Sequence, residues 1–505
     1  MERLDSLEYL HLNKWQRFAY KLALFFTSIP GFFKNVGIKI GLFFKKLGLG
    51  IVNFFRNIVL YFIHGDWKTK VSYVIMGFGS FMRGQWLRGL LFFAMEVVFI
   101  LYMVFFGGQY LASFATLGKL GATTEEVYQL GDYVSVRTTH DHSFLILLYS
   151  VLSLFFIVAF VFTWYLNIQQ NHINEEILKE KRCLTKTQDD LRALVDEKFY
   201  KTLLALPAIG ITVFTVLPII FMILVAFTDF DKNHQPPQNL FGWVGFQNFG
   251  QLFTWTTGGG ASFGATFGQI LLWTLVWAFF ATFTNYFLGM MVAMLINKKG
   301  IRLKKLWRTI LVFSIAIPQF ISLLYVSKMF ATDGIINGII SSMGGQTIPF
   351  WTDRWLAKIT VIIINIWIGI PYLMLITTGI LMNIPADLYE SAKIDGASPA
   401  QQYFKITLPY MLFVTGPYLL TSFTGNMNNF NVIFLLTGGA PTDINLYGGS
   451  GHTDLLITWL YSLTVDDTNY RLAAVIGILI FIVVALLSTI VYNVIPSTKN
   501  EEDFA

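Results

Sequence analysis

Polar side chains at helical spacing interrupt two long apolar segments in the C-terminal half of the chain. Asn365, Gly369 and Tyr372 follow an i, i+4, i+7 pattern, which places an amide, a gap and a phenol on one helix face. Asn426 and Asn429 form an i, i+3 pair in the next apolar segment. Because an amide both donates to and accepts from hydroxyl groups, and a tyrosine adds a flat ring, this face could hold a sugar. The alternative is interhelical hydrogen bonding with a packing notch at the glycine.

The polar stretch between those two segments, residues 386–409, predicts a helix, a turn and a second helix. Residues 389–395 contain no helix breaker, and Gly396 can adopt the left-handed conformation that follows a helix end. Ser398, followed by a proline and then by Gln401 three positions on, predicts an N-cap with a capping box. The expected result is a compact, pre-shaped hairpin.

The elements that position these residues must be membrane-spanning helices. Of the 505 residues, 55% are hydrophobic, 13% are charged and 49 are phenylalanines, a composition that excludes an ordinary soluble domain. A span needs about 20 apolar residues. We therefore expect an all-α polytopic membrane protein with eight spans, at residues 89–111, 144–168, 202–227, 267–296, 310–325, 359–382, 411–436 and 472–494.

The distribution of lysine and arginine predicts which connections face the cytoplasm. These residues concentrate before the first span and after the second, fourth and sixth spans, whereas the other connections contain few. Because cytoplasmic flanks carry the excess of positive charge, both termini and residues 386–409 should lie inside the cell. The basic clusters adjoin apolar segments, so they indicate a membrane surface and not nucleic acid.

The region before the first span contains an eleven-residue repeat of two phenylalanines and a basic residue. Its copies begin at Phe32, Phe43 and Phe54. Eleven residues make about three helical turns, so the repeat predicts amphipathic helices in the membrane interface, with a ninth span as the alternative. The expected parts of the chain are this basic region (1–85), two spans with a cytoplasmic linker (86–201), a core of six spans (202–496) and a cytoplasmic tail (497–505).

The hairpin at 386–409 resembles the cytoplasmic EAA loop of ABC importer permeases. The matching pattern is E-S-A-x-x-x-G-x9-I-x-L-P, in which Ser391 replaces the first alanine. In that family the loop is a coupling helix that docks on an ATPase subunit. The resemblance implies that coupling to the ATPase depends on Glu390, Ser391, Ala392, Asp395, Gly396, Ile406, Leu408 and Pro409.

Four further blocks resemble the larger permease subunit of maltose and maltodextrin ABC importers, the MalF type. They are N-I-W-I-G-I-P-Y (365–372), S-F-T-G-N-M-N-N-F (422–430), L-T-G-G-A-P (436–441) and G-H-T-D-L-L (451–456). The resemblance implies a type I ABC importer permease fold. It also implies a sugar site at mid-membrane, lined by Asn365, Ile368, Gly369, Tyr372, Asn426 and Asn429.

Three positions depart from the family's sugar site. Where the family has a tyrosine and a serine in the fifth span and an aromatic residue in the seventh, this chain has Ile315, Gln319 and Gly425. The length or linkage of the sugar should therefore differ from those of maltose. Enteric members also carry a large extracytoplasmic domain after the third span, whereas residues 229–262 are only a loop here. The short loop suits a Gram-positive type of cell.

The same resemblance implies the partners of the chain. They would be a smaller permease of the MalG type, two ATPase subunits of the MalK or MsmX type, and an extracellular sugar-binding lipoprotein. The lipoprotein would dock on outer loops 334–345 and 442–467.

An ATP-binding pattern G-x-x-x-x-G-K-[ST] is absent from the sequence. The chain should therefore be no enzyme and need no cofactor of its own, because ATP and Mg²⁺ would be used by the partner ATPase. The alternatives are a permease for another oligosaccharide, a secondary carrier, and a scaffold protein. A carrier would need ion-coupling charges within its spans, and spans three to eight contain essentially none. A scaffold would have no use for both an amide-lined face and a coupling hairpin.

Overall fold

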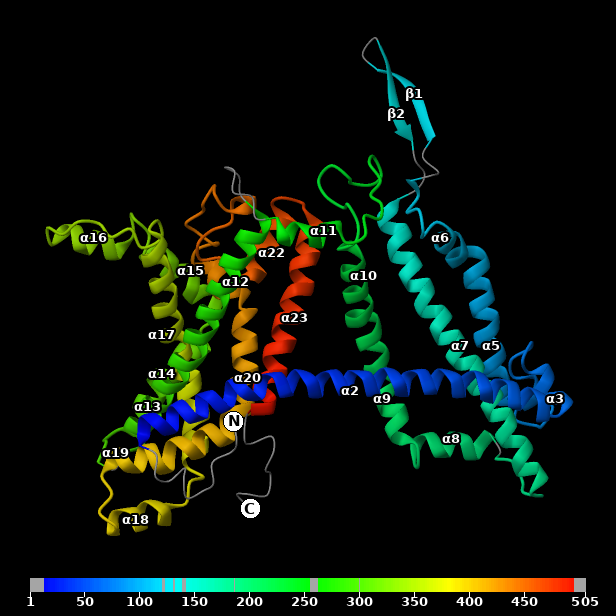
Figure 1. The fold of residues 1–505 in the computed structure, drawn as a ribbon, viewed down its shortest axis with the longest axis horizontal. Helices are drawn as coiled ribbons and strands as arrows, with labels where there is room; N and C mark the ends of the chain where they lie inside the picture. The colour runs from blue at the N-terminus through cyan, green and yellow to red at the C-terminus, as the bar shows by residue number, and fades with distance from the viewer. Residues whose placement is uncertain are drawn as a thin grey trace. The chain divides into compact units, whose positions relative to one another are not determined.

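The computed structural model describes residues 13–119, 123–129, 132–138, 142–185, 187–254, 262–298 and 300–494 (Figure 1). The predicted all-α membrane fold is confirmed, because 8 helices of this part of the chain are long and apolar enough to cross a membrane. They are the second half of α2 (Lys14–His64), α5 to α6 (Trp86–Ala112), α7 (Ser143–Lys179), α9 to α10 (Phe199–Val225), α12 to α13 (Phe263–Asn297), α17 (Arg354–Leu381), α19 to α20 (Pro399–Met427) and α23 (Tyr470–Val494).

A β-hairpin, which the sequence analysis did not predict, lies in the connection between α6 and α7. Strand β1 (Thr123–Gln129) pairs antiparallel with β2 (Asp132–Thr138), and Thr123 is opposite Thr138 (Figure 1). Threonine, valine and tyrosine recur in both strands, and these residues favour extended backbone. That signal covers only seven residues in each strand.

The predicted fifth span, 310–325, is wrong as a continuous helix. It consists of α14 (Lys304–Ala316) and α15 (Gln319–Met329), which meet at an angle of 89°. The cause is Pro318, since a proline disfavours helical backbone at the residue before it. Ile317 accordingly has extended backbone, with φ −81° and ψ 127°.

The predicted seventh span, 411–436, is likewise two helices. Helix α20 (Leu408–Met427) ends before Asn428, and α21 (Phe430–Leu436) begins after Asn429. The side-chain oxygen of Asn429 accepts a hydrogen bond from the backbone N–H of Val432 at 3.3 Å. An asparagine is a preferred N-cap, so it favours a new helix start over continuation.

The N-terminal repeat lies in one continuous helix, α2, of 51 residues. Its start is fixed by a capping box between Asn13 and Gln16, with hydrogen bonds of 2.9 and 3.0 Å. Phe43 and Phe44 are 60% and 63% exposed. The second half of α2, Gly41–His64, is also apolar enough to span a membrane, so the interfacial position and the ninth span both stay predictions.

The described residues form two compact units. The first takes residues up to 115 together with 144–218, and the second takes 116–143 and everything from 219 onward. In the first unit, the buried Arg83 donates to Asp66 at 2.8 Å and to Asn171 Oδ1 at 2.8 Å, which joins the short helices α3 (Trp67–Val71) and α4 (Phe78–Phe81) to α7. The four-part division expected from the sequence stays a prediction.

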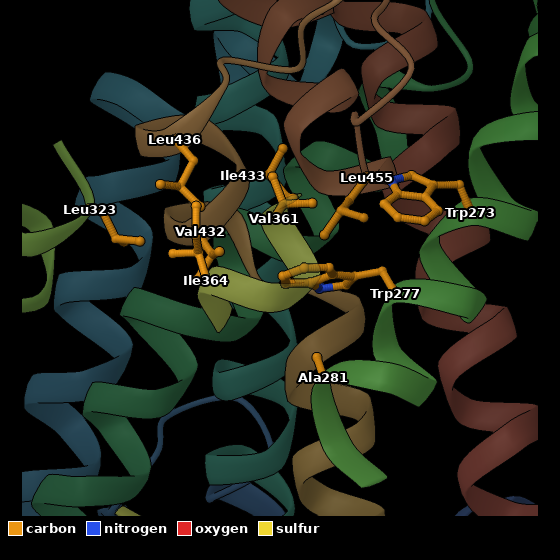
Figure 2. Packing of buried hydrophobic residues seen from close by; sticks show 10 residues of the cluster. All are labelled: Trp273, Trp277, Ala281, Leu323, Val361, Ile364, Val432, Ile433, Leu436 and Leu455. Carbon is orange, nitrogen blue, oxygen red and sulfur yellow. The ribbon is translucent and has the colours of Figure 1, made fainter. Parts of the chain in front are cut away.

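A hydrophobic core in the second unit holds α12 (Phe263–Phe279), α15, α17 and α21 together. Figure 2 shows its side chains, which are Trp273, Trp277, Ala281, Leu323, Val361, Ile364, Val432, Ile433, Leu436 and Leu455. Trp277 is fully buried, and its indole Nε1 donates to the backbone oxygen of Asn426 at 3.1 Å. The core therefore fixes α17 and the end of α20, the two helices that carry the predicted sugar residues.

Candidate functional site

A cavity of about 470 Å³ lies at the bend between α14 and α15, beside α17. Its lining combines apolar, aromatic and hydroxyl-bearing side chains: Ser314, Ile315, Ala316, Ile317, Pro318, Gln319, Ser322, Trp367, Ile368, Gly369 and Tyr372. A helix broken in mid-membrane is tolerated where its free backbone groups face a cavity. The bend at Pro318 thus creates the hollow.

Five of the predicted sugar-site residues come together in this cavity. They are Ile315, Gln319, Ile368, Gly369 and Tyr372. The tyrosine ring is 51% exposed, so its face is open to a ligand. The cavity wall also contains Trp367, Ser314 and Ser322, which were not predicted. The two serines flank the bend at Pro318, which hydropathy alone does not register.

Gly369 also makes a close contact on α17. A Cβ added to this glycine would lie 2.3 Å from Nδ2 of Asn285, so the amide of Asn285 packs directly against the backbone of α17. Asn365, one turn earlier on α17, is buried and does not line the cavity. The space at Gly369 is therefore filled by the amide of Asn285.

The two amides of the seventh segment have partners within the protein. Nδ2 of Asn426 donates to Oγ1 of Thr282 at 2.9 Å, and Nδ2 of Asn429 donates to Oδ1 of Asn426 at 3.4 Å. Neither residue, nor the exposed Gly425, is part of the cavity wall. These contacts are of the interhelical kind expected from the packing alternative.

The hairpin at 386–409 has the capping chemistry predicted for it. Helix α18 (Ala386–Ile394) ends in a Schellman motif, because Gly396 has φ 78° and the N–H of Ala397 donates to the oxygen of Ala392 at 2.8 Å. Ser398 then caps the short helix α19 (Pro399–Gln402), and its backbone N–H donates to Oε1 of Gln401 at 2.7 Å. The predicted helix end at Gly396 and the predicted capping box of Ser398 and Gln401 are confirmed, whereas the coupling role of the segment stays a prediction.

A side-chain contact closes the hairpin, and its surface is open. The hydroxyls of Tyr389 and Thr407 lie 2.9 Å apart, which joins the two arms. Ile394 and Phe404 are 87% and 63% exposed. Five of the residues predicted to couple to the ATPase are exposed, namely Glu390, Ser391, Asp395, Gly396 and Pro409. The other three are half-buried, namely Ala392, Ile406 and Leu408.

Residues 285–498 match the family of binding-protein-dependent transport system inner membrane components. The galactooligosaccharides transport system permease protein GanP of Bacillus subtilis is 32% identical over 85% of this chain and 97% of that protein. The chain belongs to this permease family. The maltodextrin permease protein MalC of Streptococcus pneumoniae is 31% identical over 86% of this chain and 97% of that protein. The Escherichia coli maltose/maltodextrin permease protein MalF is 36% identical over 43% of each chain.

The segment that matches the family contains both the cavity and the hairpin. It begins at Asn285 and contains the bent pair α14–α15, α17, the hairpin and α20. Figure 1 shows the hairpin helices α18 and α19 at the opposite end of α17 from α16 (Ile335–Ser342). The cavity and the hairpin therefore belong to one compact unit of the permease.

The loop after α21 contains a buried carboxylate. Asp454 accepts hydrogen bonds from the backbone N–H of Gly451 and from Oγ1 of Thr458, both at 2.7 Å. Burial raises the pKa of Asp454 to about 6, although these two hydrogen bonds act in the opposite direction. A Cβ on Gly439 would lie 2.4 Å from this carboxylate, so the carboxylate fixes two parts of the loop against each other.

A second cavity, of about 420 Å³, is partly lined by the same loop. It is lined by Asp231, Lys232, Asn233, Tyr447, Gly448, Asp466, Asp467, Thr468, Asn469 and Arg471. The guanidinium of Arg471 lies 3.3 Å from the carboxylate of Asp231. Part of the loop 442–467, which was predicted to meet a binding protein, forms this polar wall.

Proposed function

We propose that this permease subunit and a second, MalG-type permease together form the path by which a maltodextrin-type oligosaccharide enters the cell. The observation that carries the proposal is the cavity of about 470 Å³, because five residues predicted to meet a sugar line it. Tyr372 and Trp367 offer flat rings to sugar faces, and Gln319 offers an amide to hydroxyl groups. Relatives named as maltodextrin permeases support this class of substrate.

The proposal assigns sugar contacts also to the predicted residues outside the cavity wall. Asn365, Gly425, Asn426 and Asn429 would meet the sugar in another conformation of the complete importer, or in the half of the path shared with the second permease. These four residues and the residues of the cavity wall all lie within the segment that matches the family, which supports this assignment.

Energy would come from two ATPase subunits of the MalK or MsmX type, which use ATP and Mg²⁺. The rigid, exposed hairpin with Ile394 and Phe404 at its surface supports a docking role on the ATPase. The proposal has the hairpin and both termini in the cytoplasm, and the distribution of lysine and arginine supports this orientation. The outer loops 334–345 and 442–467 would then receive a sugar-binding lipoprotein in a Gram-positive type of cell.

The test is ATP-dependent uptake by the complete importer, reconstituted with its second permease, ATPase and binding protein. The panel contains linear α-glucans of increasing length and galactooligosaccharides, the substrate class in the name of GanP and the second candidate here. Uptake of α-glucans supports the proposal. If only galactooligosaccharides are taken up, they replace maltodextrins as the proposed substrate. Uptake without ATP would favour a secondary carrier.

A further inference from the structure

The amide of Asn285 contains a buried acceptor without a donor. Asn285 is the first residue of α13 (Asn285–Asn297) and is 5% exposed. Its Nδ2 donates to the backbone oxygen of Ala281 at 2.8 Å. Its Oδ1, however, has no hydrogen-bond partner among the described residues. A buried acceptor left in this way costs free energy unless a ligand supplies the donor.

A second asparagine of the same helix shows that this is not a general property of α13. Asn297 makes the same bond, because its Nδ2 donates to the backbone oxygen of Ala293 at 2.8 Å. Its Oδ1 accepts a hydrogen bond from the guanidinium of Arg308. The missing donor is therefore specific to the position of Asn285.

That position is beside the cavity. Nδ2, Cγ and Oδ1 of Asn285 lie 2.3, 2.6 and 3.0 Å from the point where a Cβ on Gly369 would be. The backbone of Gly369 is part of the cavity wall. Asn285 is not itself part of the cavity wall, and because Gly369 has no side chain, the amide packs directly against the glycine backbone, which is part of it. A larger residue would separate the two.

The preceding turn explains how the fourth span reaches both sugar-bearing helices. Residues Phe280–Thr284 form a π-helical turn, a feature that is frequent at functional sites. Thr282 in this turn bonds Asn426 of α20, whereas Asn285, just after the turn, contacts Gly369 of α17. The widened turn thus points one polar side chain at each helix.

We propose that Asn285 is a substrate-contacting residue, whose Oδ1 accepts a hydrogen bond from a sugar hydroxyl when the sugar occupies the cavity beside Gly369. The ligand class is a neutral, hydroxyl-bearing sugar, so the inference rests on the proposed sugar transport. Asn285 would then help to determine which ring positions of the sugar must carry a free hydroxyl.

The test compares Asn285→Leu with the wild type in the complete reconstituted importer. Leucine has a similar volume and no polar atom, so it removes the unpartnered acceptor without leaving a large void. The thermal unfolding temperature should be unchanged or higher, while the rate of sugar uptake should fall about tenfold, as for the loss of one hydrogen bond. A parallel fall in both quantities, or no change in uptake, would overturn the proposal.

Monodeoxy sugars give the second measurement. Wild type and Asn285→Leu should transport the analogue that lacks the hydroxyl meeting Asn285 at equal rates. For the other analogues, the rate of wild type should stay higher than that of the variant. An equal loss for every analogue would contradict a contact with the sugar. Asn297→Leu is the matched control: it should lower the unfolding temperature, because it removes the bond to Arg308, without changing the preference among analogues.

Two further outcomes are decisive. If the wild-type importer transports no sugar, the proposed function fails and the contact fails with it. If wild type and Asn285→Leu transport sugar equally, only the role of Asn285 fails. Should Asn285→Leu not assemble, the smaller Asn285→Ala replaces it, and failure of both variants would assign the residue to folding and overturn the proposal.

Discussion

At Gly369 the side chain of Asn285 packs directly against the backbone of α17. The glycine's position in an i, i+4, i+7 pattern was visible in the sequence, but its contact was not, because an apolar segment does not reveal which neighbour it faces. Asn285 was missed for the same reason. Ile315 and Gln319 were predicted by resemblance, and they share the cavity because Pro318 breaks the helix between them.

Substitution Gly369→Ala should destabilise the permease. Its methyl group would lie 2.3 Å from Nδ2 of Asn285, and such overpacking costs about 1 to 3 kcal/mol. Gly379→Ala on the same helix is the control, because nothing lies within 4 Å of its Cβ position and alanine favours a helix by up to about 1 kcal/mol. Relative to the wild type, the thermal unfolding temperature should be lower for Gly369→Ala and higher for Gly379→Ala. An equal effect of both would contradict the close contact.

Asp454 should make stability depend on pH. Its pKa of about 6 in the folded protein exceeds the value near 3.8 of a free side chain, so the unfolded chain releases the proton first. The contribution of Asp454 to stability is therefore greatest below pH 4 and falls by about 3 kcal/mol as the pH rises to 6 and beyond. Asp454→Asn should lack this loss and unfold at a higher temperature than wild type at pH 7. A wild type that gains stability relative to the variant over this range would refute the assignment.

Local capping chemistry made the hairpin predictable, whereas the breaks in the spans were not foreseen. Gly396, Ser398 and Gln401 act on immediate neighbours, so their sequence positions determine the geometry. The fifth and seventh spans were predicted from hydropathy alone, which does not register a bend. The signals for both breaks, Pro318 and Asn429, stand in the sequence and act by known local rules.

Substitution Gly396→Val should uncouple ATP hydrolysis from uptake. The glycine has φ 78°, a conformation that costs a residue with a Cβ roughly 1 to 2 kcal/mol, so a branched side chain would disrupt the turn and misplace α18. We expect sugar uptake to fall at least about fivefold, in line with such a cost, while membrane insertion is kept. The measurement is uptake against ATPase activity in the reconstituted importer.

Asparagine tolerates this backbone conformation, so Gly396→Asn is the matched control and should retain most of the uptake. Full uptake by Gly396→Val would remove the coupling role of the hairpin. Loss of uptake by both variants would instead indicate that the glycine's small size matters, for example at a contact with the ATPase.

At the scale of the whole molecule, the side of the membrane on which the N-terminus lies depends on α2. If α2 lies in the interface and the bent pair α14–α15 counts as one span, eight spans put both termini on one side. If Gly41–His64 crosses the bilayer as well, the number is nine and the termini lie on opposite sides. Charge bias favours the interface, because Lys45 and Arg56 recur at the eleven-residue period of the phenylalanine pairs.

The single cysteine, Cys183, can decide this question. It is exposed and follows α7, in a connection whose lysines and arginines predict a cytoplasmic position. A membrane-impermeant thiol reagent should therefore label it only in permeabilised cells. In a Cys183→Ser background, Ser6→Cys should behave in the same way, because an interfacial α2 leaves the N-terminus inside. Labelling of Ser6→Cys in intact cells, while Cys183 of the wild type stays protected in intact cells, would show that α2 crosses the membrane. The aromatic repeat would then face lipid along a span instead of lying beneath the headgroups.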